Sequence, residues 1–260
     1  MTYLNNRNPA IVAAVNEISG TYSDTVSVEQ KAKSLIKFGV NGNIGTTEEM
    51  VWGQGGIETL ATGNDIDTIS SSNAGDTQSV TIEGHTLSGS ELTFVIQSAT
   101  LNGQNKVTLT TPLYRSTRMF NNSGTAFAGD IYVYEDGAIS SGVPDTAADI
   151  HLKASIGDDQ SLKCATSVSN LDYWIVTGLT LGVNKSASRA VEFKLQVKEF
   201  GKVFRTRFFA SCSSDTGSIH IPFDPCIIIP KNSDVRVLAT SSGTSTGVEA
   251  SIHGHLALVV

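Results

Sequence analysis

The sequence predicts an all-β protein, and three features support this fold class. Only 17% of the 260 residues are charged, against roughly 25% in an average soluble domain, and Ser and Thr are abundant where helical enzymes carry Glu, Lys, Leu and Ala. Short segments in which apolar and polar residues alternate recur along most of the chain, as half-buried strands require. Gly- and Asn-containing turns separate these segments. The length fits one large domain or two small ones.

Residues 1–56 lack this pattern, and we expect them to form an irregular, extended N-terminal arm. Asn8-Pro9 resembles an N-cap followed by a first-turn proline, so residues 10–18 are expected to form two helical turns. Residues 28–52 mix Gly and Asn with scattered apolar residues and show no sustained period. Because such a segment cannot build its own core, we expect it to lie on another surface and to bury its aromatic residues there.

Residues 57–145 are expected to form a first small β domain. Its Thr-rich strands are separated by turn residues such as Gly84, Gly89 and Asn102-Gly103. The Gly142-Val143-Pro144-Asp145 cluster interrupts the series of strands and is interpreted as the domain boundary. The expected strands cover residues 79–83, 92–96, 106–110, 113–119 and 130–134.

Residues 146–260 are expected to form a C-terminal, jelly-roll-like β-sandwich, because eight further strands fit two packed sheets. Alternation is clearest over residues 191–198, where four apolar residues take one face and four polar residues take the other. Prolines 222, 225 and 230 bracket short strands, as expected at strand ends. The expected strands cover residues 162–168, 173–181, 190–198, 203–209, 218–221, 226–229, 235–239 and 248–259.

Charge and hydropathy argue against two classes of partner. The formal net charge is −7 and the chain has no run of Lys or Arg, so we expect neither nucleic acid nor an anionic membrane surface as a partner. The N-terminus lacks the apolar segment of a secretory signal, and no apolar stretch is long enough to span a bilayer. We therefore expect the protein to act where it is made, in the cytoplasm, unless an assembly carries it elsewhere.

Residues with catalytic or metal-binding chemistry are present without the spacing that this chemistry needs. His253-x-His255 places two rings on one face of a strand, but a third ligand has to come from a distant segment. The three cysteines are odd in number and lack metal-type spacing, and no Gly-x-Ser-x-Gly motif occurs. We expect no enzyme activity, no metal and no cofactor.

Several short motifs resemble a family of tailed-bacteriophage virion proteins that occur in marine and cyanobacterial phages. The motifs are Phe38-Gly39, residues 46–56, residues 128–133, Ser141-Gly142-Val143-Pro144 and residues 200–206. The resemblance extends from about residue 35 to the end of the chain. It implies β-domain trimers that sit on the phage capsid as decoration (cement) proteins.

We therefore expect a structural protein of the virion that is made in the host cytoplasm and binds the outer surface of the head. Its expected partners are the major capsid protein and itself, as a homotrimer, because the apolar end of the chain leaves an adhesive sheet edge in a monomer. Two alternatives remain. One is a receptor- or glycan-binding module of a tail fibre or baseplate that uses loops such as residues 241–247. The other is a β-sandwich carbohydrate-active enzyme, which the lack of a paired-acid signature disfavours.

The expected contact residues are aromatic or apolar residues of the arm and two arginines of a later strand. Arg205-Thr206-Arg207 places two cations on one face of that strand, either as an ordinary polar face or as a contact to acidic loops of a subunit. Deletion of residues 1–34 is expected to leave both β domains folded and to weaken attachment to the capsid. The expected capsid or subunit contacts are Tyr3, Leu4, Tyr22, Leu35, Phe38, Trp52, Arg205 and Arg207.

Overall fold

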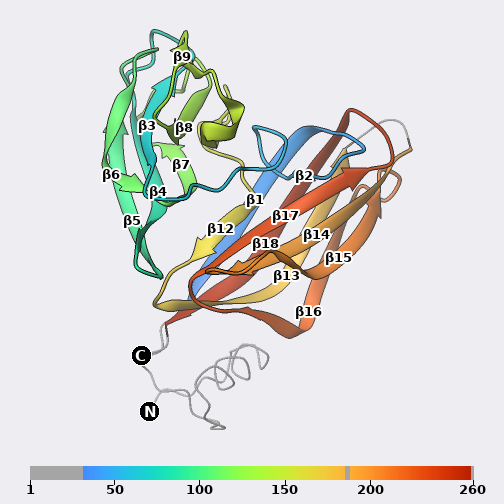
Figure 1. Ribbon diagram of the computed structural model, residues 1–260. Helices are drawn as coiled ribbons and strands as arrows, with labels where there is room; N and C mark the ends of the chain where they lie inside the picture. The colour runs from blue at the N-terminus through green and yellow to red at the C-terminus, as the bar shows by residue number, and fades with distance from the viewer. Residues whose placement is uncertain (1–31, 185–187, 259–260) are drawn as a thin grey trace.

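The computed structural model describes residues 32–184 and 188–258. Within these ranges the regular structure consists of strands and one short 3-10 helix, η1 (Ala147–Asp149), which confirms the all-β fold class. Two β units lie next to each other, a larger sandwich and a smaller domain at its side (Figure 1). The chain leaves the sandwich once, builds the small domain, and then returns to complete the sandwich.

The sandwich contains two antiparallel sheets whose strands follow the order of a jelly roll. Counted along the chain, its eight main strands lie in the orders 1-8-3-6 and 2-7-4-5. The first sheet consists of β1 (Ala32–Ile44), β18 (Thr246–Leu258), β13 (Asp172–Asn184) and β16 (Ser218–Ile229). The second consists of β12 (Ala165–Val168), β17 (Ser233–Ser241), β14 (Ala190–Glu199) and β15 (Arg205–Ser213), with β2 (Glu49–Met50) beside β17.

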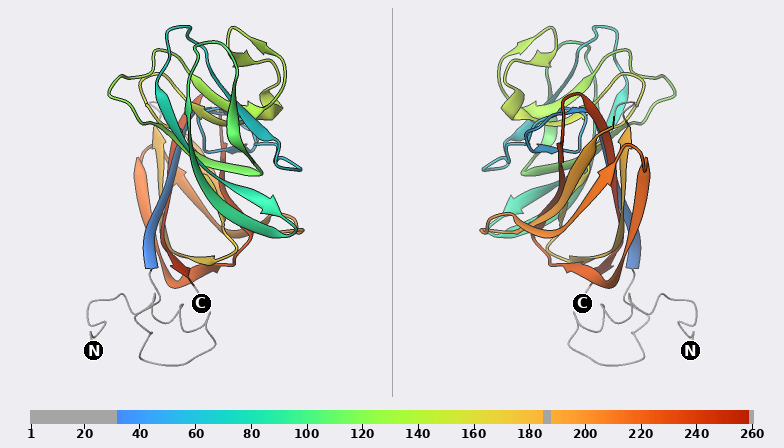
Figure 2. Two further views of the ribbon diagram at one scale, coloured as in Figure 1. Left: turned by 90° about the vertical axis from the view of Figure 1, so that its left-hand side faces the viewer. Right: turned by 90° about the vertical axis from the view of Figure 1, so that its right-hand side faces the viewer.

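The small domain is inserted between the first and second main strands of the sandwich. It has a four-stranded and a three-stranded antiparallel sheet, and β5 packs beside β6 while β7 packs beside β11. The first sheet consists of β11 (Ile150–Ala154), β8 (Ile131–Glu135), β3 (Ile66–Ser71) and β6 (Val107–Leu113). The second consists of β5 (Glu91–Thr100), β4 (Ser79–Ser88) and β7 (Arg115–Asn121). The long β4–β5 hairpin extends from this domain along the side of the sandwich (Figure 2).

Each domain has its own apolar core. Trp174 and Phe193 are buried between the two sheets of the sandwich, and Ile82 and Met119 are buried in the small domain. The alternation predicted in β14 is confirmed, since its apolar residues face the sandwich core and its polar residues do not. Those buried residues are Val191, Phe193, Leu195 and Val197.

The expectation of an irregular arm is wrong for residues 32–56, whereas residues 1–31 lie outside the described part of the chain. Residues 32–44 form strand β1, which pairs with β18 along almost its whole length. Residues Glu49–Met50 form β2 and pair with β17. The expected arm therefore does not include residues 32–44 or Glu49–Met50, which belong to the sandwich. The deletion of residues 1–34 considered above would remove the first three residues of a sandwich strand.

The pattern of β1 explains why the sequence concealed this strand. Its inward positions carry Lys37, Gly39 and Asn41, which are buried, whereas apolar side chains face outward. Lys37 Nζ donates to the carbonyl of Thr117 at 2.7 Å, and Asn41 Nδ2 donates to the carbonyl of Met50 at 3.1 Å. A Cβ atom at Gly39 would lie 2.3 Å from the backbone nitrogen of Cys164, so only glycine fits there. The usual polar-out, apolar-in alternation is thus inverted.

The domain boundary also differs from the expected position at residue 145. β11, which follows that position, pairs with β8 of the small domain. The Ser141-Gly142 pair is a tight turn between β9 (Ile139–Ser140) and β10 (Val143–Pro144), with φ of 50° and 77°. Two consecutive positive φ angles are typical of a two-residue hairpin turn. The cluster that suggested a linker is therefore a local hairpin within the domain.

Trp52 is 2% exposed and packs with Met50, Ala165 and Leu238, so it is not a free anchor. Trp52→Ala is expected to lower the free energy of unfolding by about 3 to 5 kcal/mol, because it opens a cavity at a buried site. Urea denaturation followed by circular dichroism measures this loss. Phe209→Ala, at a site that is 66% exposed, is the control and should leave the midpoint nearly unchanged. An unchanged midpoint for Trp52→Ala would contradict its placement in the core.

Candidate functional site

A groove of about 720 Å³ lies between the two domains, within the size range of sites that enclose a ligand. One wall is strand β1 from Lys33 to Phe38, and the other is the β4–β5 hairpin of the small domain. Residues of β7, of β12 and of the segments on either side of β12 line it as well, together with Leu256 of β18. Because consecutive residues of β1 line the groove, it runs along the edge of this strand and not across one face.

The tip of the β4–β5 hairpin is anchored to the sandwich, which fixes the wall of the groove. The backbone nitrogen of Leu92 donates to Asn232 Oδ1 at 2.9 Å, and the backbone nitrogen of Asn170 donates to the carbonyl of Leu92 at 2.8 Å. Asn170 Nδ2 also lies 3.2 Å from Glu91 Oε2. The hairpin therefore spans the groove from the small domain to the far end of the sandwich, as Figure 1 shows for β4 and β5.

Apolar side chains are concentrated in the groove. Five of the eleven large apolar residues that are exposed in the described part of the chain line it, and their exposed fractions are 40–61%. Exposed apolar residues that gather in one place mark interaction sites, whereas single ones carry no such meaning. The five residues are Ile36, Phe38, Phe94, Ile96 and Leu171.

β1 is the last strand of its sheet and lines the groove with its outer edge. It pairs with β18 only, among the strands that the structure describes, whereas β4 and β5 line the groove with alternate residues and therefore with one face of their hairpin. The outward amide and carbonyl groups of a last strand have no partner within the sheet, so such an edge is a template for another strand. The groove therefore combines apolar side chains with free backbone hydrogen-bonding groups.

A buried ionic network joins the two domains next to the groove. Lys163 Nζ donates to Glu58 Oε1 at 2.6 Å, to the carbonyl of Ser116 at 3.2 Å and to the carbonyl of His151 at 2.9 Å. His151 Nδ1 lies 3.1 Å from Glu58 Oε1, and its Nε2 lies 3.0 Å from Glu135 Oε1. Every hydrogen-bonding position of the Lys163 ammonium group is thus used.

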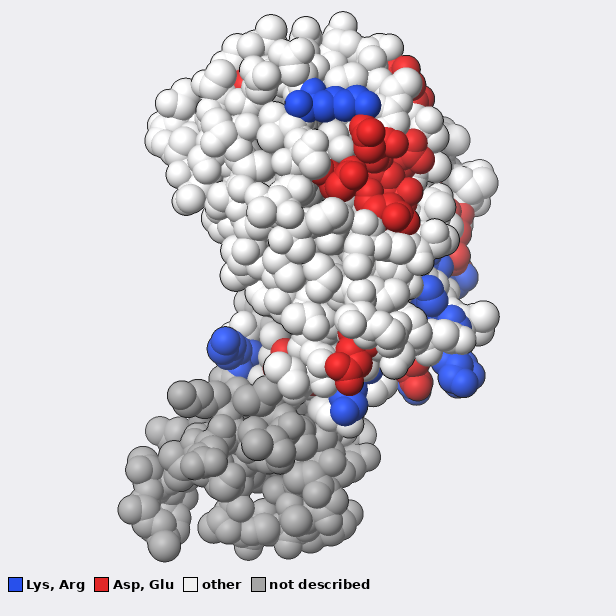
Figure 3. Space-filling view, turned by 60° about the vertical axis from the view of Figure 1, so that its left-hand side comes forward, with Lys and Arg blue, Asp and Glu red and all other residues white. Residues whose placement is uncertain are grey.

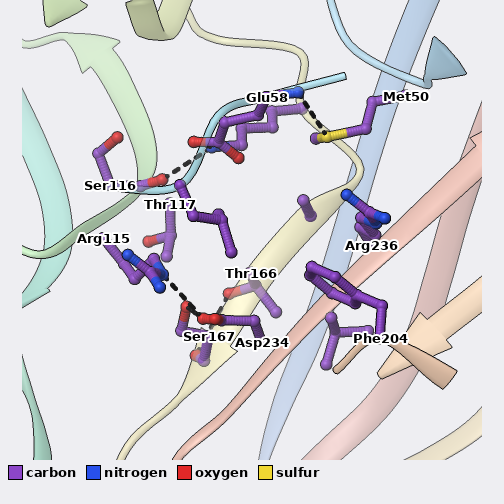
Figure 4. Close-up of a pocket in the computed structure, with 14 residues that line it drawn as sticks. Met50, Glu58, Arg115, Ser116, Thr117, Thr166, Ser167, Phe204, Asp234 and Arg236 are labelled. Atoms are coloured by element: carbon purple, nitrogen blue, oxygen red, sulfur yellow. Dashed lines mark hydrogen bonds and ion pairs between the residues drawn. The ribbon is translucent and has the colours of Figure 1, made fainter. Parts of the chain in front are cut away.

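A second buried ion pair connects the same two domains. Arg115 of β7 donates through Nε to Asp234 Oδ1 of β17 at 3.1 Å, and Ser167 Oγ donates to the same oxygen at 2.7 Å. Figure 4 shows Arg115 pointing toward Asp234, with Ser167 beside it. The cavity at this point has a volume of about 20 Å³, which is room for about one water molecule. These charges therefore neutralise one another and leave little space for a ligand.

The buried charges have displaced pKa values. Burial, the largest effect, raises the pKa of Glu58, but Lys163 and His151 outweigh it and hold that pKa below its ordinary value. Burial lowers the pKa of Lys163, with Glu58 acting against this change. Burial also lowers the pKa of Lys37 to about 8. The shift at Lys37 is large because the ammonium group is buried and donates to a backbone carbonyl, and no carboxylate of the described residues forms an ion pair with it.

The structure separates the predicted contact residues. Tyr3, Leu4 and Tyr22 lie outside the described residues. Leu35 and Phe38 line the groove, so these two lie where a partner can reach them. The expectation of a contact at Trp52 conflicts with the structure, because its side chain is buried. Arg205 and Arg207 are exposed on β15, at the opposite edge of its sheet from β12, and Arg207 Nη2 lies 3.8 Å from Glu199 Oε1.

Sequence reasoning missed the groove residues of the β4–β5 hairpin. Phe94 and Ile96 are two positions apart in β5, so both side chains lie on one face. That alternation was visible in the sequence, but nothing in it indicated that this face is exposed. Ile36 was hidden by the inverted pattern of β1.

The histidine pair His253-x-His255 does not converge on one ion. His253 instead lies beside His220, with ring centroids 5.6 Å apart, and both rings contact Thr180 Oγ1 at 3.0 Å. The described residues contain no group of three or more potential metal ligands of the His, Cys, Asp and Glu types. No helix in the described ranges is long and apolar enough to cross a membrane.

Charged side chains are sparse on one face of the protein. Figure 3 shows acidic side chains gathered on the small domain, while most of the face in view carries no charge. This distribution agrees with the net charge of −7.

No protein-family model matches the chain, and no curated protein is similar to it in sequence. The structure is weakly similar to proteins of virus particles. A structure of the Gx strain of infectious bursal disease virus is 10% identical over 90% of this chain and 74% of that chain, with a TM-score of 0.25. The VP2 subviral particle of the same virus is 14% identical over 96% and 77%, with a TM-score of 0.21. Similarity at this level assigns neither a family nor a function.

Glu58→Gln is expected to lower the free energy of unfolding by about 3 kcal/mol at pH 7, because Lys163 loses its buried counter-charge. In the wild type, the contribution of Glu58 is complete above its unfolded pKa near 4.5 and is lost as the pH falls through the lower folded pKa. The variant should therefore lose less stability than the wild type on acidification. Urea denaturation at pH 3 to 7 measures both effects.

Asp136→Asn is the matched control for Glu58→Gln, because it breaks an ion pair with Lys106 in which the two side chains are 60% and 37% exposed. This variant should remain close to the wild type. Equal stability for both variants would contradict the role given to the buried network.

Lys37→Met tests the buried lysine of β1. Below pH 8 both states of the wild type carry the proton, whereas between pH 8 and 10.5 only the unfolded state binds it, so stability rises with pH in this window. The rise is on the order of 3 kcal/mol for a shift of this size. Lys37→Met should remove this increase in the free energy of unfolding. Lys33→Met, at an exposed site of the same strand, should retain it. Chemical denaturation at pH 7 to 10.5 compares the three proteins, and identical slopes would contradict the burial of Lys37.

Proposed function

We propose that this chain is a non-enzymatic structural protein of a phage virion, which decorates the outer surface of the head and stabilises it. The observation that carries this proposal is the groove, in which the free edge of β1 and clustered apolar side chains face a fixed wall. In an isolated protein such a surface promotes aggregation, because it pairs with other chains. In a protein whose function is to assemble, the same surface provides the contact to its partner.

The architecture supports the same proposal by analogy. Jelly rolls are the fold of many viral capsid domains, although lectin domains use them as well. A fold does not determine a function. The analogy therefore supports the proposal only in combination with the groove. The motifs that resemble phage virion proteins, among them residues 46–56, point in the same direction.

The rigid connection between the domains also suits a structural role. Two buried ion pairs and the anchored hairpin tip hold the domains in one arrangement. A decoration protein has to resist deformation of the shell that it covers, and a fixed two-domain block resists better than two domains on a flexible linker. We propose the major capsid protein and further copies of this chain, as a homotrimer, as its partners.

A receptor- or glycan-binding module of the tail is the second candidate, because lectin domains share the jelly roll. The loop considered for this role is a tight turn tied by local hydrogen bonds. Ser241 Oγ and Thr246 Oγ1 are 2.8 Å apart, and both residues are buried. Between these two residues Ser242, Thr244 and Ser245 are exposed, so the loop offers polar surface and does not by itself decide between the two roles.

Immunogold labelling of intact virions tests the proposed function. Decoration predicts gold particles spread evenly over the heads. Label confined to the tail would overturn the proposal and support the receptor-binding alternative. Virions that lack the protein should release DNA at a lower temperature than complete virions, and equal release temperatures would contradict the stabilising role.

Deletion of residues 1–31 is expected to leave the β domains folded, because β1 begins at Ala32, and to weaken attachment to the capsid at least tenfold. Co-sedimentation with capsids stripped of the protein measures occupancy against concentration. Circular dichroism provides the folding control. Unchanged occupancy would place the capsid contact on the β domains alone.

A further inference from the structure

We propose that the groove binds the N-terminal segment of a second copy of this chain, residues 22–29, as an added strand on the free edge of β1. The inference deepens the proposed function, because it names the partner of the same groove. It requires no capsid, however, and a purified protein is enough to test it.

The length and position of the groove fit one strand. The edge of β1 that lines it runs from Lys33 to Phe38, which is about 20 Å at 3.3 Å per residue. An extended segment of eight residues spans about 26 Å and therefore covers this edge. Added strands gain affinity from backbone hydrogen bonds and specificity from pockets for alternate side chains. The exposed apolar side chains of Ile36, Phe94 and Ile96 provide the apolar surface for such pockets.

The sequence before β1 has the pattern that this groove requires. In residues 22–29 the side chains of Tyr22, Val26 and Val28 fall on one strand face together with Asp24, and the other face holds Ser, Thr and Glu29. A strand with this pattern presents a mainly apolar face with one carboxylate to the groove and a polar face to water.

The charges of the two surfaces are opposite. Residues 22–29 contain two carboxylates, Asp24 and Glu29, and no Lys or Arg. The groove is lined by Lys33, Lys37 and Arg118 against two carboxylates, Glu83 and Asp172, while the charge of Lys163 is neutralised by Glu58. Complementary charge of this kind favours the correct partner and its orientation.

The donor of the strand is a neighbouring copy and not the same chain. To lie on its own β1, the segment 22–29 has to reverse direction at residues 30–32, which are Gln-Lys-Ala. Tight turns favour Gly, Asn, Asp, Pro or Ser, and none of them occurs in residues 28–33. A segment that continues past the end of β1 instead reaches the next molecule. Each copy then gives one strand and receives one, and a head-to-tail contact of this kind forms a ring when the rotation closes, which for the proposed homotrimer is a ring of three.

Disulfide trapping in the full-length chain tests the inference. Val26→Cys and Ile96→Cys are introduced together in a Cys226→Ser background, because Cys226 is half-buried whereas the other two native cysteines are buried. Under mild oxidation we expect covalent dimers and trimers on a non-reducing gel. Val26→Cys with Phe209→Cys, on the outer edge strand β15, is the control and should remain monomeric. A cross-linked band of monomer size would overturn the assignment to a second copy.

Sedimentation of full-length variants gives a test that does not depend on the register of the added strand. Ile36→Asp with Ile96→Asp, both at exposed sites, should lower the mass threefold, from trimer to monomer. Ile156→Asp, at a site 63% exposed outside the groove, should keep the trimer. A trimer that survives the groove substitutions, or a wild type that is monomeric at micromolar concentration, would overturn the inference. If the inference fails in this way, gold label that is evenly distributed over virion heads would still support the proposed function.

Discussion

The ion pair between Lys163 and Glu58 is the interaction on which the arrangement of the two domains depends. Glu58 lies on the segment by which the chain leaves the sandwich, and Lys163 lies on the segment by which it returns. Each side chain is about 5% exposed, so neither charge is stable without the other. The pair therefore holds together the two chain segments that connect the domains. Trp52 packs against this ion pair from the sandwich side, with its ring centroid 5.5 Å from Lys163 Nζ.

The groove exists because these two connecting segments are held together. With the small domain held against the sandwich, the β4–β5 hairpin reaches along the open side between β1 and β12, and its tip is bonded to Asn170 and Asn232. The hairpin covers the edge of β1 without pairing with it. What remains is a channel that has backbone groups on one side and apolar side chains on the other. This geometry is poor for chemistry on a small molecule and well suited to an extended peptide.

The sequence predicted some elements and concealed others for physical reasons. β14 was predictable because its core-facing residues are all apolar, and the sandwich followed from a series of such strands. β1 was not predictable, because its buried positions hold Lys37, Gly39 and Asn41, each of which is accommodated by a contact outside the strand. The partners Glu58 and Lys163 are 105 positions apart, and nothing local indicates that they meet. The groove was invisible for the same reason, since it exists only once both domains are placed.

The central claim is that the free edge of β1 is occupied by another chain when the protein is assembled. Hydrogen–deuterium exchange of the purified full-length protein, compared with Ile96→Asp, measures this edge directly. The account predicts that the amides of residues 33–38 that face away from β18 exchange slowly in the wild type. They should exchange at least tenfold faster in the variant, whereas amides of β14 in the sandwich core should not change. Rapid exchange of the β1 edge in both proteins would contradict the claim.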